Sequence, residues 1–136
     1  MNKENCIFCK IIAGDIPNDT VYEDDYTLAF LDIAPRAKGH TVVIPKTHAL
    51  YITDMVDADI SALFLSVKQV TSRLQEVLHP DGFSIGVNHG EAGGQAVPHV
   101  HVHIMPRWNG DGGGNMHSIV DAARDISVGE ISQLFL

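Results

Sequence analysis

The sequence predicts an α+β fold: a five-stranded antiparallel sheet with helices covering one face, built with one long helix and one short N-terminal helix. Five runs of β-branched and apolar residues are separated by turn residues, and one segment repeats apolar side chains at helical spacing. The strand connections are short. Short connections favour antiparallel neighbours, because parallel strands need long crossovers.

A short helix is expected near the N-terminus, over residues 6–13. Gly14 follows it at a position where glycine tolerates a left-handed backbone. Pro17 then prevents the helix from continuing. Both residues separate this helix from the first strand.

Three strands are expected next, at residues 20–23, 26–31 and 40–44. Asp24 and Asp25 form the turn of a hairpin between the first two strands. Pro45 ends the third strand, since proline has no N–H to donate to a ladder.

Residues 57–78 show the clearest helical periodicity in the chain. Their apolar side chains recur three and four positions apart and form one stripe: Ile60, Leu63, Phe64, Val67, Val70, Leu74, Val77 and Leu78. Asp57 is expected to cap the first turn by accepting hydrogen bonds from free backbone amides. A turn with proline and glycine at residues 79–82 ends the helix, and residues 83–88 form the fourth strand.

The fifth strand, residues 99–105, contains three histidines in strict alternation with apolar residues. Because side chains of a strand alternate between faces, one face holds His99, His101 and His103 and the other faces the core with Val100, Val102 and Ile104. At a rise of about 3.3 Å per residue, the outer histidines lie about 13 Å apart. A straight strand cannot bring all three to one metal ion, so we expect them to have different roles.

The chain of 136 residues is interpreted as one domain, 1–136, in which residues 108–136 are a glycine-rich loop and an apolar C-terminal tail. The apolar tail leaves room for a dimer. A net charge of −8 argues against partners that are nucleic-acid polymers, which require a basic face. No apolar run is long enough to cross a membrane and no signal peptide is evident, so a cytoplasmic protein is expected.

The only two cysteines, Cys6 and Cys9, form a C-x-x-C pair. In a reducing compartment this pair suggests metal or redox chemistry more than a structural disulfide. Two thiolates from one turn are half of a tetrahedral zinc site, and His48 and His99 are candidates for the other half. A closed site of this kind would be structural, because no position remains for water. Inert buried cysteines are the alternative.

Several segments together resemble the histidine triad (HIT) superfamily. Residues 99–105 match its pattern of histidine-apolar-histidine-apolar-histidine-apolar-apolar at every position. The resemblance extends over nearly the whole chain, through residues 6–9, 29–35, 39–46 and 88–95. It is closest to the Hint-like branch, in the zinc-bearing form often seen in bacteria.

The resemblance implies an α+β domain, usually a homodimer, that binds purine nucleotides and cleaves at the α-phosphate. By this resemblance His101 attacks phosphorus and His103 contacts the phosphate. The remaining nucleotide contacts that it implies are Asp32 to the ribose, Phe30 and Ile33 around the base, and Asn88, Gly94, Gln95 and Ala96 around the phosphate. The implied ligands of a structural zinc ion are Cys6, Cys9, His48 and His99.

One residue departs from the Hint-like pattern. Ala96 stands where Hint hydrolases carry a serine that is thought to assist the leaving group. This leaves phosphoramidate specificity open, and Gln95 is a candidate to replace that serine.

The chemistry requires an uncharged imidazole with one bare nitrogen facing phosphorus, and imidazole meets this condition near neutral pH. The other ring N–H then needs an acceptor, for which a backbone carbonyl is the expected group. The leading interpretation is a nucleotide hydrolase or transferase acting through a nucleotidyl-histidine. The alternatives are a dinucleoside polyphosphate hydrolase, a metallohydrolase that shares one ion between His99 and His101, and a nucleotide-binding or scaffolding module without turnover.

Overall fold

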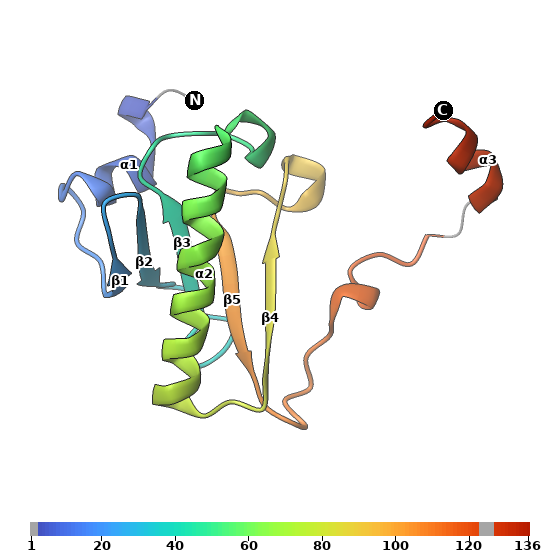
Figure 1. Cartoon of the computed structure of the whole chain (residues 1–136). Coiled ribbons are helices and arrows are strands. Elements are labelled where there is room, and N and C mark those ends of the chain that lie inside the picture. Colours follow the sequence, from blue (N-terminus) through green and yellow to red (C-terminus); the bar gives the residue numbers. More distant parts are fainter. Residues whose placement is uncertain (1–2, 123–126) are drawn as a thin grey trace.

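The computed structural model describes residues 3–122 and 127–136 and confirms the expected fold class (Figure 1). Five strands form one sheet in the order β1-β2-β3-β5-β4, and every neighbouring pair is antiparallel. Their bounds are β1 Thr20–Glu23, β2 Thr27–Leu31, β3 Thr41–Pro45, β4 Gly82–Val87 and β5 Val102–Arg107. The sheet therefore has β1 and β4 as its edges.

The two expected helices are present, with a difference in one detail. The helices are α1 Ile7–Ile12, α2 Asp57–Leu78 and α3 Val128–Gln133, of which α3 was not predicted. Short 3-10 turns lie at Lys3–Asn5, Ile52–Asp54, Glu91–Gly93 and Met116–Ser118. Asp57 is the first residue of α2 and not its cap; Val56 holds the cap position without a side-chain bond. The Asp57 carboxylate instead adds negative charge at the positive end of the helix dipole. Within the described residues, no helix has the length and apolarity that a bilayer crossing requires.

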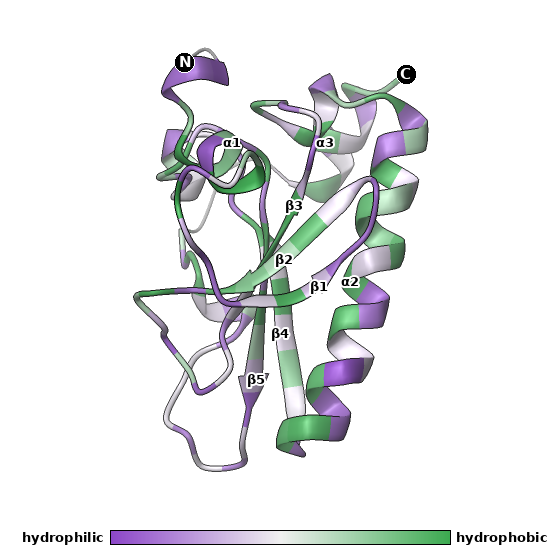
Figure 2. Cartoon of the chain, turned by 90° about the vertical axis from the view of Figure 1, so that its left-hand side faces the viewer, coloured by the Kyte–Doolittle hydropathy of each residue, from purple (hydrophilic) through white to green (hydrophobic). Residues whose placement is uncertain are grey.

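Helices cover both faces of the sheet, so the expectation of helical cover on one face is wrong. On one face, α2 packs its Leu63, Val67 and Val70 against strand residues that include Val43 and Ile104. On the other face, α1 packs against the strand residues that point away from α2. Together they form a second cluster: Cys6, Phe8, Cys9, Leu28, Phe30, Val42 and Ile44. Figure 2 shows the apolar character of β3 between these layers and the alternation of apolar and polar residues along α2.

The fifth strand begins three residues later than the sequence predicts. β5 starts at Val102, whereas His99 lies in a bend before it. The His99 N–H donates to the Val97 carbonyl at 2.9 Å. The Val100 N–H donates to the Ala49 carbonyl at 2.8 Å, outside the sheet ladder. Val100, Val102 and Ile104 still enter the α2 core as expected. The bend gives His99 a direction that a straight strand would not allow.

The C-terminal segment leaves the domain after β5. Figure 1 shows it running away from the sheet, with α3 standing apart from the other elements. Arg107 holds the start of this segment through a two-point ion pair with Asp111, at 2.8 Å for both contacts. The apolar residues of the segment are uncovered, with Phe135 85 % exposed.

Leu63→Ala is expected to lower the free energy of unfolding by about 2–5 kcal/mol, because it removes a side chain of 0 % exposure from the α2 core. Leu65, on the same helix, is 63 % exposed, so Leu65→Ala should change that energy by no more than about 0.5 kcal/mol. Urea denaturation followed by circular dichroism measures both. Equal losses would contradict the packing described.

Candidate functional site

His101 is held as a neutral imidazole with a defined tautomer. It is 6 % exposed, and its Nδ1–H donates to the carbonyl of His99 at 2.7 Å. The carbonyl can only accept, so the proton lies on Nδ1 and Nε2 keeps its lone pair. Burial lowers the pKa of His101, more than the hydrogen bond to His99 raises it. An edge of the Phe8 ring contacts it at a centroid distance of 5.2 Å.

His40, which the sequence indicates only as an ordinary strand-end histidine, orders His103 in a similar way. The Arg36 N–H donates to His40 Nδ1 at 3.1 Å, so the proton of a neutral His40 lies on Nε2. His40 Nε2 lies 3.0 Å from His103 Nδ1 and donates to it. His103 therefore carries its own proton on Nε2, ready to donate to a ligand. Burial is the main cause of the lowered pKa of both rings, and it brings that of His103 to about 4.

The place of His40 follows from strand pairing. It stands directly before β3, and β3 pairs with β5 so that Val42 is opposite His103. From the sequence, His40 could be placed beside His103 only if β3 and β5 were known to be neighbours. Asp32 joins the group, with Oδ2 3.6 Å from His40 Nε2 and Oδ1 accepting the Ala34 N–H at 2.9 Å.

The two expected base contacts lie in different environments. Phe30 is 6 % exposed and packs edge-on against Phe8 at 5.6 Å, beneath the histidines. Ile33 is 94 % exposed. Of this pair, Ile33 is the one that offers an uncovered apolar side chain to a ligand.

The connection after β4, residues 89–95, which we call the glycine loop, is organised by Gln95. Its Oε1 accepts the Gly90 N–H at 2.8 Å, and its Nε2 donates to the carbonyls of Leu50 and Val97 at 2.9 and 3.1 Å. The backbone N–H groups of Gly94 and Gln95 are also used inside the loop. Within the described part of the chain, the Ala96 N–H has no acceptor, and the Asn88 side chain lies exposed against Gly94. These two groups can therefore donate hydrogen bonds to a ligand.

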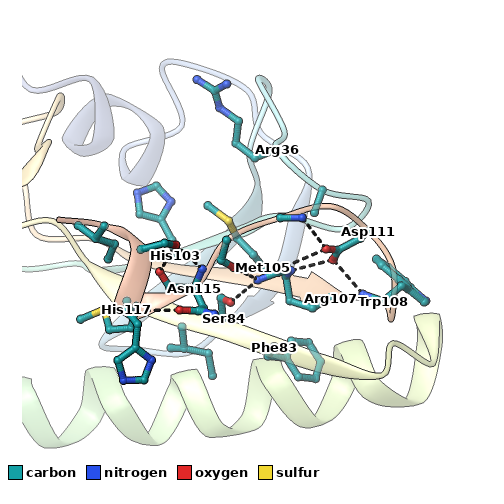
Figure 3. A pocket seen from close by; sticks show the side chains of 18 of the residues that line it. Arg36, Phe83, Ser84, His103, Met105, Arg107, Trp108, Asp111, Asn115 and His117 are labelled. Atoms are coloured by element: carbon teal, nitrogen blue, oxygen red, sulfur yellow. Dashed lines mark hydrogen bonds and ion pairs between the residues drawn. The ribbon is translucent and has the colours of Figure 1, made fainter. Parts of the chain in front are cut away.

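A cavity of about 1140 Å³ adjoins His103 (Figure 3). It begins at His103 and Asn88, follows β4 and β5, and ends at Arg107 and Trp108 under the C-terminal segment. His101 is not among its lining residues. The Arg107 guanidinium is paired with Asp111, whose pKa it holds far below the ordinary carboxyl value. The cavity therefore contains no unpaired arginine at that end.

Four side-chain atoms that could bind a metal ion lie close together beside the His99 ring. They come from Cys6, Cys9, His48 and His99, and all lie within 4.8 Å of one another. The distances are 3.3 Å from Cys6 Sγ to His99 Nδ1, 3.3 Å from Cys9 Sγ to His48 Nδ1, and 3.1 Å between the two Nδ1 atoms. Zinc bond lengths in a tetrahedron place such atoms about 3.3–3.8 Å apart, which these distances approach.

The protonation of this group, which we call the Cys2His2 cluster, fits a divalent cation. His99 Nε2–H donates to the Pro45 carbonyl at 2.8 Å, so its Nδ1 lone pair faces the thiols. Both cysteines are free and buried, and burial is the main cause that raises the pKa of the Cys9 thiol to about 11. A bound cation would stabilise the thiolates that burial disfavours.

His101 belongs to neither group of potential ligands found among the described residues. The second group is Asp32, His40 and His103. There the Arg36 N–H keeps the His40 proton on Nε2, where it faces His103 and not a cation. His99 has both ring nitrogens engaged away from His101. The geometry therefore does not support one ion shared by His99 and His101.

Comparisons with known proteins agree with this arrangement. The family model of the HIT domain matches residues 13–110. The chain is 49 % identical over 112 residues to "Protein hit" of Bacillus subtilis, covering 82 % of this chain and 77 % of that protein. It is 43 % identical over 105 residues to "Adenosine 5'-monophosphoramidase hnt1" of Schizosaccharomyces pombe, covering 77 % of this chain and 76 % of that protein.

Solved structures extend the match to the fold. The crystal structure of a HIT family member from Bacillus subtilis aligns with a TM-score of 0.84 at 41 % identity, covering 96 % of this chain and 92 % of that one. A Zn-bound histidine triad family protein from Mycobacterium smegmatis aligns with a TM-score of 0.77 at 40 % identity, covering 82 % and 81 %. The matched residues contain the five-stranded sheet and His99, His101 and His103. This chain therefore belongs to the HIT family.

Proposed function

We propose that the protein hydrolyses nucleoside 5′-phosphate derivatives at the α-phosphate, with His101 as the nucleophile. The observation that carries this proposal is the 2.7 Å hydrogen bond from His101 Nδ1–H to the His99 carbonyl. It leaves Nε2 unprotonated, which a nucleophilic imidazole requires. The name of the yeast relative, an adenosine 5'-monophosphoramidase, supports a purine nucleotide substrate.

The proposed reaction has two steps. In the first, His101 Nε2 forms a bond to phosphorus while the bond from phosphorus to the leaving nitrogen or oxygen breaks, and the leaving group departs with a proton taken from solvent. In the second, water attacks phosphorus and returns a proton to solvent, the phosphorus–nitrogen bond breaks and the nucleoside monophosphate is released. Water is the only co-reactant, and His101 regains its starting state.

Charge on the phosphate oxygens would be stabilised by neutral donors. The proton of His103 is placed on Nε2 by the hydrogen bond from His40, and the Asn88 side chain and the Ala96 N–H lie at the two ends of the glycine loop. The Gln95 side-chain amide would stabilise the shape of this loop, since it is hydrogen-bonded to the backbone of Gly90, Leu50 and Val97. Asp32 and Ile33, at the end of β2, are the proposed contacts to the ribose and the base, with Phe30 supporting them from the core.

We also propose that the Cys2His2 cluster holds a structural zinc ion. Its ligand distances, its free thiols and the Zn-bound relative support this assignment. Zinc there would link α1 to the segment between the glycine loop and β5. Free thiols persist in a reducing environment, which favours the cytoplasm as the compartment.

A homodimer through β4 completes the proposal. β4 is an edge strand, and an unpaired edge with apolar neighbours favours pairing with another chain. Ile85 on β4 and Phe64 on α2 are exposed and line one shallow groove. The Thr71 hydroxyl in this groove is buried without a hydrogen-bond partner among the described residues.

His101→Ala is expected to lower kcat for an adenosine phosphoramidate by about 10³-fold or more with the fold intact, because it removes the nucleophile. His79→Asn is the matched control: His79 is an exposed histidine in a left-handed conformation at the end of α2, which asparagine tolerates. Steady-state kinetics measures both. A His101→Ala enzyme within tenfold of wild type would contradict the assignment.

A panel of phosphoramidates, adenylyl sulfate and dinucleoside polyphosphates identifies the leaving group. Because Ala96 supplies no hydroxyl, we expect the largest kcat/KM for derivatives whose leaving group takes up a proton easily, such as the amines of phosphoramidates. Tight binding of AMP without turnover of any member of the panel would instead indicate a nucleotide-binding module.

Removal of zinc is expected to lower the melting temperature by about 10–20 °C, since a ligand at a thousandfold excess over its Kd contributes about 4 kcal/mol. Elemental analysis should find one zinc ion per wild-type chain and none in Cys6→Ser. His117→Ala, which changes an exposed histidine of the C-terminal segment, should keep the metal. Wild-type protein without bound zinc after expression in zinc-supplemented medium would refute the assignment.

Ile85→Lys is expected to convert the dimer to a monomer, because it places a charge in the apolar groove beside β4. Leu65→Lys, on the part of α2 outside that groove, should leave the dimer intact. Light scattering coupled to size exclusion gives the mass of each variant. A wild-type protein with the mass of one chain would count against the dimer.

A further inference from the structure

The cavity beside His103 adjoins the proposed phosphate donors but not the proposed nucleoside contacts. His103 and Asn88 both line it. Phe30, Asp32 and Ile33, the proposed contacts to the base and the ribose, are not among its lining residues. With the nucleoside at those three residues, the other substituent of phosphorus, which is the leaving group, is directed into this cavity.

The position of the proposed nucleophile agrees with this direction. In a displacement at phosphorus, the attacking and the leaving atoms lie roughly in line on opposite sides of the phosphorus atom. The His101 ring packs against the His103 ring at a centroid distance of 4.9 Å, but it does not line the cavity. A phosphate bound at both rings therefore has the nucleophile on one side and the cavity on the other.

Two cationic side chains that line this cavity have no acidic partner. Arg36 and Lys38 are exposed, and neither forms an ion pair with any carboxylate in the described part of the chain. The third cation, Arg107, is neutralised by Asp111, the only carboxylate among the described lining residues. The unpaired charge of the cavity is therefore positive, although the chain as a whole carries −8.

The loop that carries these two cations is anchored on both sides of Lys38. The Arg36 N–H donates to His40 Nδ1 at 3.1 Å. Gly39 has a φ of +82°, and a Cβ at this position would overlap the Leu78 side chain at the end of α2. The backbone of the loop is thus fixed beside the cavity, whereas its two cationic side chains are free to turn.

The Arg36 side chain is suited to bind an anion in the cavity. Figure 3 shows it at one edge, pointing away from His103. Its charge still acts on the neighbouring ring, because the pKa of His40 is lowered mainly by burial and further by Arg36, against the opposing charge of Asp32. The guanidinium can turn toward a ligand without breaking an ion pair, and its planar fork matches an anionic group through two parallel hydrogen bonds.

We propose that this cavity binds the leaving group of the substrate and that Arg36 and Lys38 make it selective for a leaving group that carries an anion. Among amine leaving groups, these are amines with a carboxylate or a phosphate, as in amino acids and aminoalkyl phosphates. The phosphorus–nitrogen bond of the substrate breaks as His101 bonds to phosphorus, and the amine departs with a proton from solvent and its anionic group unchanged. The inference rests on the proposed function, and it makes Arg36 and Lys38 specificity-determining residues.

The test compares two substrates of nearly equal size, the adenosine 5′-phosphoramidates of glycine and of glycinamide. The first leaving group carries a carboxylate and the second a neutral amide. Because the two amines differ in basicity, the quantity compared between proteins is the ratio of the two kcat/KM values. The phosphoramidate of 2-aminoethyl phosphate is a third substrate, and it distinguishes phosphate from carboxylate as the preferred anion.

Arg36→Gln and Lys38→Gln each remove one positive charge from the cavity. Each should lower kcat/KM for the glycine derivative relative to the glycinamide derivative by about fivefold, the upper range for an exposed ion pair, and the double variant by about 10- to 25-fold. The glycinamide derivative should keep its kcat/KM within about twofold. Arg73→Gln is the matched control: it removes the same charge from an exposed position of α2 outside the cavity and should leave the ratio unchanged.

An unchanged ratio in the double variant, or an equal loss for both substrates, would overturn the proposal. Salt gives a second criterion. Raising the ionic strength from about 0.05 M to about 0.5 M should lower the preference of the wild-type protein for the glycine derivative, because salt screens exposed charges. A preference that rises with salt would show that the negative charge of the whole chain controls the ratio, and would also overturn the proposal.

Binding of uncleavable analogues separates failure of this proposal from failure of the proposed function. In these analogues a CH₂ group replaces the bridging nitrogen, and isothermal titration calorimetry gives the Kd of the carboxylate and amide forms without turnover. Tighter binding of the carboxylate form, lost in the double variant, would retain the selectivity of the cavity even if the protein cleaves neither substrate, a result that would refute the proposed function. Cleavage of both substrates, with equal Kd values for the two analogues, would overturn the selectivity and retain the proposed function.

Discussion

The hydrogen bond from His101 Nδ1–H to the His99 carbonyl is the interaction on which the candidate site depends. It determines which nitrogen of a buried imidazole is bare, and burial keeps that imidazole neutral by lowering its pKa. His40 acts in a parallel way on His103, with the Arg36 amide as the fixed starting point. In the proposed function, the site would thus offer a phosphate a neutral nucleophile and neutral donors, within a protein of net charge −8.

Much of the fold could be predicted because the hydrophobic pattern of each element is strong. The stripe of residues 57–78 and the alternation through Val102 and Ile104 agree with the structure. The position of α1 on the opposite face could not be predicted, because it depends on which side of β2 and β3 receives the cysteine helix. Leu28 and Phe30 are apolar on that face, but Ala29 is apolar on the other face. The pattern of β2 therefore does not indicate which face α1 covers.

The candidate site could be predicted only in part, for reasons of local geometry. Alternation indicated that three histidines would have different roles, but the bend at His99 was not visible, since it comes from contacts with Val97 and Ala49. The role of His40 required knowing that β3 and β5 are neighbours. The Gln95 side chain was a candidate to replace the serine of the Hint-like pattern, whereas it is engaged by Gly90, Leu50 and Val97; no local pattern distinguishes these uses of a side-chain amide.

The most direct test of this account is to trap the covalent intermediate. Wild-type protein is mixed with an adenosine phosphoramidate, quenched in base to preserve the phosphorus–nitrogen bond, digested and mapped by tandem mass spectrometry. The account predicts an adenylyl group on Nε2 of His101 that disappears as AMP forms. Product formation with no adduct on the enzyme, or with the adenylyl group on another residue, would contradict it.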